Sequence, residues 1–91
     1  MKEPEFKPFK VAAVSSNRNS FGLTGLVLIA QDGEAWQVGA SQHHIKTKDD
    51  IVQVPVVGKQ DRNFAALGFE IPERLPRPPA EAVAEVWGTK Q

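Results

Sequence analysis

The sequence predicts a single, mainly β domain: a small curved five-stranded antiparallel sheet or barrel, then a proline-rich connector and a short C-terminal helix. Three observations favour this fold class. The chain has 91 residues and a mass of 10.0 kDa, which is enough for one domain and no more. Short runs of apolar and β-branched residues alternate with polar or glycine-containing turns. An alanine-rich segment with apolar residues at helical spacing occurs only near the C-terminus.

Composition and charge narrow the class of protein. Hydrophobic residues make up 41% of the chain and charged residues 24%, as in ordinary soluble domains. Basic and acidic residues each number 11, so a globally basic nucleic-acid-binding protein is disfavoured. The chain contains no cysteine, which excludes disulfides and thiolate metal sites. No apolar run is long enough to span a membrane and the N-terminus is charged, so we expect a cytoplasmic protein that does not bind membranes.

The chain divides into four segments. Residues 1–8 predict a flexible N-terminal arm, because two prolines and several charges follow neither a strand nor a helix period. The β domain is expected over residues 9–71, and five strands at short spacing suggest an SH3-like or OB-like size. The connector covers residues 72–79 and the C-terminal helix residues 80–88.

A central hairpin is the most strongly indicated element. Asp32-Gly33 separates the apolar run 23–30 from the alternating run 34–40, and this dipeptide is typical of a two-residue type I′ turn. The first of these strands is apolar on both faces, which favours a central position in the sheet. Trp36 lies on the apolar face of the second strand and is expected to be a buried core residue.

Three further strands complete the predicted sheet. The first covers residues 9–14 and ends in a polar loop. Residues 51–57 are dense in β-branched side chains, and Pro55 places this strand at an edge or at a bulge. The last strand is expected over 64–71, because Gly68 and the proline at position 72 weigh against a helix there.

The C-terminal part combines a stiff segment with an amphipathic helix. Four prolines predict an extended, polyproline II-like connector over residues 72–79. Residues 80–87 predict a helix with Val83, Val86 and Trp87 on one side. So short a helix is marginal alone, so this stripe is expected to dock either on its own domain or on a partner.

Catalytic and metal-binding motifs are weak in this sequence. His43 and His44 are adjacent, so on a strand they would point to opposite faces, and no third ligand has a suitable spacing. Asp49-Asp50 lies beside lysines and is typical of a solvated turn. The serines lack a nucleophile motif, and no glycine motif for phosphate opens a helix. The sequence therefore predicts no enzyme activity, no metal and no cofactor.

The loop of residues 15–21 is a candidate ligand surface, because it joins a cation, amides, hydroxyls and an aromatic ring between two strands. The alternative interpretation folds Phe21 into the core and leaves an ordinary turn, and it is the favoured one. The candidate binding residues are Arg18, Asn19, Phe21, Lys46, Lys48 and Arg62.

The function expected from these observations is that of a non-catalytic small binding or adaptor module. Its partner is expected to be a protein, with self-association through the uncharged strand 51–57 as one form of this. The alternative is a nucleic-acid-binding small β-barrel that uses the loop 15–21 and scattered basic residues. Zero net charge makes such binding weak and salt-sensitive.

Overall fold

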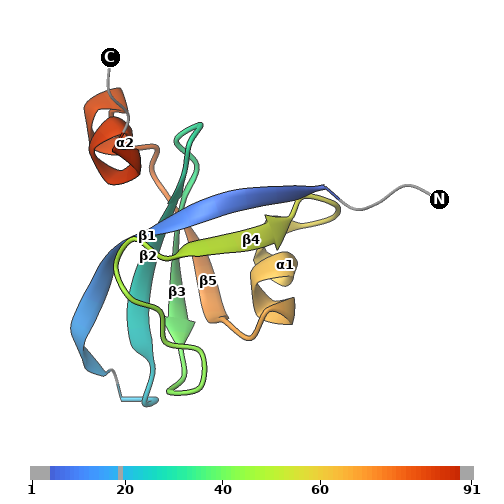
Figure 1. The fold of residues 1–91 in the computed structure, drawn as a ribbon. Coiled ribbons are helices and arrows are strands. Elements are labelled where there is room, and N and C mark those ends of the chain that lie inside the picture. The colour runs from blue at the N-terminus through green and yellow to red at the C-terminus, as the bar shows by residue number, and fades with distance from the viewer. Residues whose placement is uncertain (1–4, 19, 89–91) are drawn as a thin grey trace.

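The computed structural model describes residues 5–18 and 20–88, and the side chains of residues 16–18 lie outside that description. The chain forms one antiparallel sheet with two short helices (Figure 1). The elements are β1 (Phe6–Arg18), β2 (Thr24–Ala30), β3 (Ala35–Ala40), β4 (Ile51–Pro55), α1 (Gln60–Ala66), β5 (Glu70–Leu75) and α2 (Ala80–Trp87).

The predicted mainly β class is confirmed, and the five-stranded sheet is open rather than closed into a barrel. The strand order is β4-β1-β2-β3-β5, so β4 and β5 are its two edge strands. The expected central position of β2 and the edge position of Pro55 are confirmed by this order. Helix α1 packs against both edge strands and covers the space between them (Figure 1).

The hairpin of β2 and β3 is confirmed, but its turn differs from the predicted two-residue type. The Gly33 N–H donates to the Ala30 carbonyl, and the Ala30 N–H donates to the Glu34 carbonyl, so three residues form the loop. Gly33 has a φ of 97°, whereas Asp32 does not have a positive φ. This is the three-residue hairpin loop in which glycine occupies the left-handed position at its end.

β1 is longer than the predicted strand 9–14. The prediction of a loose arm over residues 1–8 is wrong for residues 6–8, because these pair with β4 from Phe6 opposite Pro55 to Pro8 opposite Gln53. Residues 1–4 lie outside the described part of the chain. Two register shifts against β2 let the long strand curve while it pairs with strands on both sides.

The prediction of a strand over residues 64–71 is wrong, because its first half belongs to α1. Gly68 does not oppose a helix here but ends one. It has a φ of 99°, and its N–H donates to the Ala65 carbonyl. The Phe69 N–H donates to the Phe64 carbonyl, which completes a Schellman motif. The Phe64 and Phe69 rings also contact each other, with their centroids 6.5 Å apart.

The prediction of a polyproline connector over residues 72–79 is wrong in its first half, because β5 continues to Leu75. The register with β3 turns the backbone groups of Glu73 and Leu75 toward that strand. Pro72 and Pro76 occupy the alternate positions, which face away from the sheet. An edge strand tolerates proline at such positions, since an N–H there would have no strand partner.

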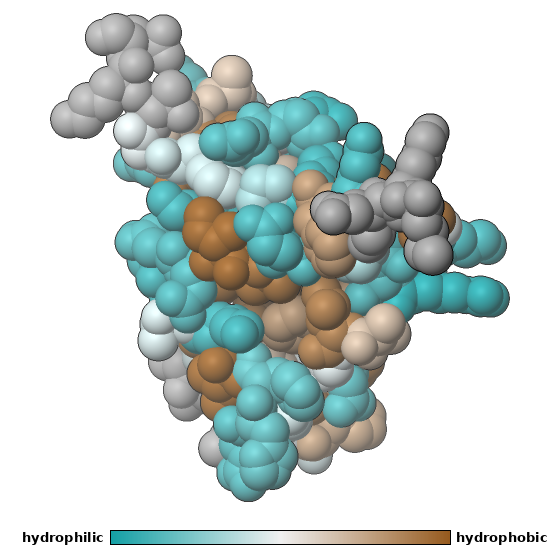
Figure 2. Space-filling view, turned by 45° about the vertical axis from the view of Figure 1, so that its right-hand side comes forward, coloured by the Kyte–Doolittle hydropathy of each residue, from teal (hydrophilic) through white to brown (hydrophobic). Residues whose placement is uncertain are grey.

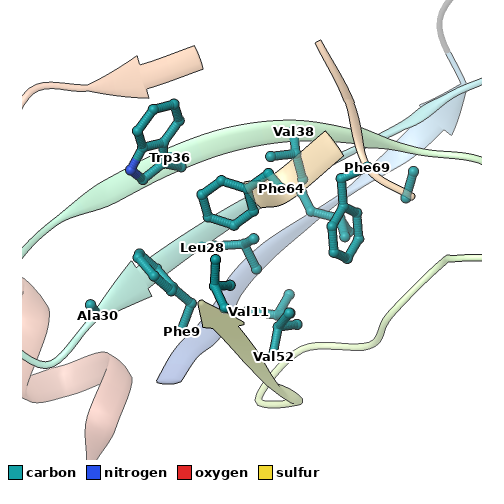
Figure 3. Close-up of a cluster of buried hydrophobic side chains, with 12 residues drawn as sticks. Phe9, Val11, Leu28, Ala30, Trp36, Val38, Val52, Phe64 and Phe69 are labelled. Atoms are coloured by element: carbon teal, nitrogen blue, oxygen red, sulfur yellow. The ribbon is translucent and has the colours of Figure 1, made fainter. Parts of the chain in front are cut away.

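Buried apolar side chains surround Phe64 on one face of the sheet, which we call the inner face (Figure 3). The Phe64 ring centroid lies 5.3 Å from that of Phe9 and 5.3 Å from that of Trp36. The predicted burial of Trp36 is confirmed, since 5% of this residue is exposed. The cluster consists of Phe9, Val11, Leu26, Leu28, Ala30, Trp36, Val38, Ala40, Val52, Val54, Phe64 and Phe69.

The predicted C-terminal helix is confirmed as α2, which packs on the opposite face of the sheet, the outer face. The Trp87 indole N–H donates to the Ile29 carbonyl at 3.0 Å, and the Lys10 ammonium lies 5.3 Å from the Trp87 ring centroid. The other two residues of the predicted stripe are half-buried, namely Val83 and Val86. Among the described residues, neither helix has the length and apolar character needed to cross a membrane.

Candidate functional site

The two histidines lie in the connection between β3 and β4, and both are exposed. The Ser41 hydroxyl oxygen lies 3.1 Å from His44 Nδ1, and the His44 ring packs on the backbone at Gly68, where a Cβ atom would clash with it. His44 thus holds this connection against the turn between α1 and β5. In the part of the chain that the structure describes, no three His, Asp or Glu side chains gather as a metal-binding group.

The predicted binding residues lie on different parts of the fold. Lys46 and Lys48 belong to the β3–β4 connection, whereas Arg62 is exposed on α1, which packs on β4 and β5. Asn19 lies outside the described residues, and so does the side chain of Arg18. Two of the three described cations of this set thus lie in one connection, and the third lies on a helix.

A hollow of about 370 Å³ lies between α2, β1 and the turn that precedes β4. Its walls include Lys48, Asp49 and Glu85, so its rim carries charges of both signs. Val86 also lines it, which places the second residue of the predicted docking stripe beside its own domain. The mixed charge does not favour binding of a polyanion there.

Phe21 is 77% exposed, so the expectation that it folds into the core is wrong. The buried apolar residue of this loop is Leu23 instead. Thr24 pairs with Ala40, so the β1–β2 loop and the β3–β4 connection lie at the same end of the sheet (Figure 1). Phe21 therefore presents an aromatic ring to solvent at that end.

A charged cluster lies at the other end of the sheet, at the β2–β3 turn. The Lys7 ammonium lies 2.7 Å from a carboxylate oxygen of Asp32 and 2.6 Å from one of Glu34. The second oxygen of Glu34 accepts a hydrogen bond of 2.7 Å from the Trp36 indole N–H. Lys7 thus ties β1 to the β2–β3 turn, and Glu34 satisfies the polar atom of a buried tryptophan.

β5 and the segment after it add two arginines to this cluster. The Arg74 guanidinium lies 3.4 Å from Glu34 and 5.1 Å from the centroid of the Trp36 ring, and Arg77 donates to the Asp32 carbonyl. These groups come from three strands, the turn and the segment after β5, and they are paired with one another. The charged cluster therefore holds the edge strand β5 against the β2–β3 turn. Its cations are paired within the cluster and are not directed at a ligand.

The pKa values within the charged cluster shift as this pairing requires. Burial would raise the pKa of Glu34, but hydrogen bonds from Lys7 and Trp36 outweigh it and hold the pKa below its usual value. The hydrogen bond from Lys7 also lowers the pKa of Asp32. Burial would lower the pKa of Lys7, and its bonds to the two carboxylates raise it instead.

Exposed apolar side chains are spread over several elements. On the face drawn in Figure 2, apolar residues form patches that are broken and bordered by hydrophilic ones. Such scattered exposure is ordinary for a small domain and does not by itself mark a binding surface. The large apolar side chains that are exposed are Phe6, Val14, Phe21, Ile45, Ile51, Val56, Val57 and Ile71.

One hollow on the outer face has a distinctive construction, and we call it the glycine hollow. Gly25 on β2 and Gly39 on β3 are direct cross-strand partners in a non-hydrogen-bonded pair, where two strands approach most closely. A depression of about 120 Å³ lies beside this pair, and the Leu23 side chain covers Gly39, because its Cδ1 atom would be 2.9 Å from a Cβ added there. Its lining is completed by Leu23, Gln37, Val38, Ile71 and Glu73.

Ile71 borders the glycine hollow in an unfavourable backbone conformation. Its φ is 50°, in the left-handed region that a β-branched residue rarely adopts. The register between β3 and β5 shifts at this point, because Gln37 is opposite Glu73 while Gly39 is opposite Glu70. Ile71 lies in the resulting bulge, and its side chain is 62% exposed.

The residues around the glycine hollow are not among the predicted site residues. The predicted two-residue turn at Asp32-Gly33 would place Gly25 opposite Ala40, and only the three-residue loop of the structure places it opposite Gly39. The sequence also gives no signal for Ile71 and Glu73, because it predicts Ile71 at the end of a strand over 64–71 and Glu73 in the connector.

Comparisons with protein-family models, with curated proteins and with solved structures found no match to this chain.

Proposed function

We propose that this chain is a non-catalytic binding domain and that the glycine hollow is the surface that receives its protein partner. The observation that carries the proposal is the backbone of Ile71. A left-handed β-branched residue costs about 1–3 kcal/mol, and such strain concentrates at functional positions. An isoleucine exposed at 62% recovers little of the free energy that burial would provide. A partner that covers Ile71 would supply that burial.

The β4 edge of the sheet is poorly suited to adding a strand from another chain. At the β4 edge, the register with β1 leaves Ile51, Gln53 and Pro55 facing away. Pro55 has no N–H, and its carbonyl already accepts hydrogen bonds from Asn63 at 2.8 Å and from Gln60 at 3.3 Å. Self-association through this strand therefore has few backbone groups available to it, and recognition through side chains on the outer face is favoured.

Substitution of Gly25 by valine tests the proposal, because it adds a side chain to the glycine hollow at a position where a Cβ atom fits. The nearest atoms to an added Cβ are 3.7 Å away, and the φ of Gly25 is not positive. We expect the free energy of unfolding, measured with urea, to rise by up to about 1 kcal/mol, because valine favours a strand and restricts the unfolded chain.

Binding is expected to change in the opposite direction. Peptides selected from a random display library against the unsubstituted protein should bind Gly25→Val at least about tenfold more weakly. They should bind Gln53→Val unchanged, since this control places the same side chain on the outer face of β4. A selection that enriches no peptide, or peptides that bind Gly25→Val equally well, would contradict the proposal.

Exposure of Phe21 favours a second candidate function, the binding of single-stranded nucleic acid at the β1–β2 loop. An aromatic ring in solvent can stack on a base, which contributes roughly 1–3 kcal/mol per base. Phe21→Ala should then weaken binding of a fluorescent oligonucleotide by at least about fivefold and leave the melting temperature unchanged. Equal binding by the variant, or no binding at low salt, would contradict this candidate.

A further inference from the structure

The chain between β5 and α2, residues 76–79, is extended and is stiffened by its prolines; we call it the proline segment. It belongs to neither a helix nor a strand, and it runs past the β2–β3 turn to α2 (Figure 1). Pro79 has a φ of −64° and a ψ of 156°, the values of a polyproline II helix. The ring fixes φ near the same value at Pro76 and Pro78, and Arg77 precedes a proline, which disfavours a helical conformation for it. The proline segment is therefore a short polyproline II helix.

The proline segment presents two of its three edges to solvent. A polyproline II helix has three residues per turn, so residues i and i+3 lie on the same edge. Pro76 and Pro79 share one edge, and both are exposed. Arg77 on the second edge is exposed as well, whereas Pro78 on the third is half-buried and lies against the rest of the chain. The exposed pair has the P-x-x-P spacing that proline-binding domains recognise.

The proline segment is held at both ends and in the middle. Before it, β5 pairs with β3 as far as Leu75. After it, α2 is fastened to the outer face by the hydrogen bond of 3.0 Å from the Trp87 indole N–H to the Ile29 carbonyl. Between these points, the Arg77 guanidinium donates to the Asp32 carbonyl. Because the segment is already held in its extended form, less conformational entropy is lost when a partner binds it.

We infer that the proline segment is the ligand of a second protein, a proline-binding domain whose groove is lined by aromatic side chains. The rings of Pro76 and Pro79 provide apolar surface, and proline has no N–H, so their burial leaves no backbone donor unsatisfied at these positions. The carbonyls of a polyproline II helix have no internal partner, so tryptophan and tyrosine in such a groove can donate to them. This surface lies beyond the end of β5 and is separate from the glycine hollow. The inference thus goes beyond the proposed function and makes the chain an adaptor that joins two proteins.

A second copy of this chain is a less suitable partner. A proline-binding groove needs several aromatic side chains next to one another on the surface. Among the described residues, the exposed aromatic side chains are Phe6 and Phe21, which lie at opposite ends of β1. They cannot line one groove, so the groove is expected on a different protein.

A titration with purified proline-binding domains tests the inference. The probes are a panel of SH3 and WW domains, each added to the intact isotope-labelled chain and followed by NMR. We expect at least one domain to shift the amide signals of Arg77 and Ala80, with a dissociation constant of about 10–100 µM. The double variant Pro76→Ala, Pro79→Ala should weaken that binding at least about tenfold, because it removes both rings from the exposed edge.

Further variants make the test specific. Pro76→Ala alone lies outside α2, and it should weaken binding at least about threefold even if the double variant unfolds. Pro72→Ala is the matched control, since it removes a proline ring from β5 outside the proline segment and should leave binding unchanged. The inference is overturned if no domain of the panel shifts these signals, if the proline variants bind equally well, or if the shifts fall on another surface.

The outcomes also separate this inference from the proposed function. Gly25→Val should not change binding of the panel domain, and the double proline variant should not change binding of library-selected peptides. Loss of one activity without the other then assigns each to its own surface. If the panel domain and a selected peptide compete for the chain, the two surfaces overlap and the inference of a second one is wrong.

Discussion

Replacement of Phe64 by alanine is expected to lower the free energy of unfolding by about 3–5 kcal/mol, the usual cost of deleting a buried phenylalanine. Phe64 is fully buried and its ring contacts those of Phe9, Trp36 and Phe69. A domain of this length has a total stability of about 5–14 kcal/mol, so the loss removes a large fraction of it. Urea denaturation followed by tryptophan fluorescence measures the change.

The control for this variant is Ala65→Ser, on the exposed side of the same helix, which should change stability by less than about 0.5 kcal/mol. A loss below about 1 kcal/mol for Phe64→Ala would contradict the role assigned to α1, namely that it fills the space between the two edge strands.

Replacement of Glu34 by alanine is expected to lower the free energy of unfolding by about 2–3 kcal/mol, because it leaves polar groups without partners. The Glu34 side chain is 14% exposed and receives the Trp36 indole N–H and the Lys7 ammonium. Glu34→Gln should cost less, since an amide oxygen still accepts from the indole. Equal losses for the two variants would show that the charge, and not the buried hydrogen bond, dominates.

The same pairing predicts how stability depends on pH. The folded pKa values of Glu34 and Asp32 lie below their ordinary values of 4.5 and 3.8. Their contribution to stability is therefore complete above those values and is lost as the pH falls through the lowered pKa values. The pKa of Lys7 is raised above 10.5, so its contribution is complete below that pH and is lost as the pH rises through the raised value. Melting temperatures of Glu34→Gln should fall less steeply in acid than those of the unsubstituted chain.

The central hairpin could be predicted from sequence because its signals are local. A turn dipeptide and a period-two pattern around Trp36 are both contained in one short stretch. The error at Gly68 arose because one glycine fits either a broken strand or the end of a helix, and a seven-residue helix is too short for its period to be clear. Pro72 and Pro76 argue locally against a strand, and only the register with β3 places them at positions that face away from the sheet.

The glycine hollow could not be predicted because it depends on pairing between distant segments. The positions of Ile71 and Glu73 relative to Gly39 are set by the register shift between β3 and β5. That shift arises between segments far apart in sequence, and no local pattern specifies it. The exposure of Phe21 could not be predicted either, because it depends on how the folded chain packs around the loop.

The position of Phe64 has a consequence for the order of events during folding. Its ring joins Phe9 from the first strand and Trp36 from the third, so the core is complete only when segments far apart in sequence have met. The entropy of closing these loops is lost before the core contacts can stabilise the chain. In addition, α1 is too short to be stable as a helix before the core forms. Folding is therefore expected on the millisecond-to-second timescale of sheet proteins. The hairpin of β2 and β3 is expected to form first, and α1 is expected to pack last.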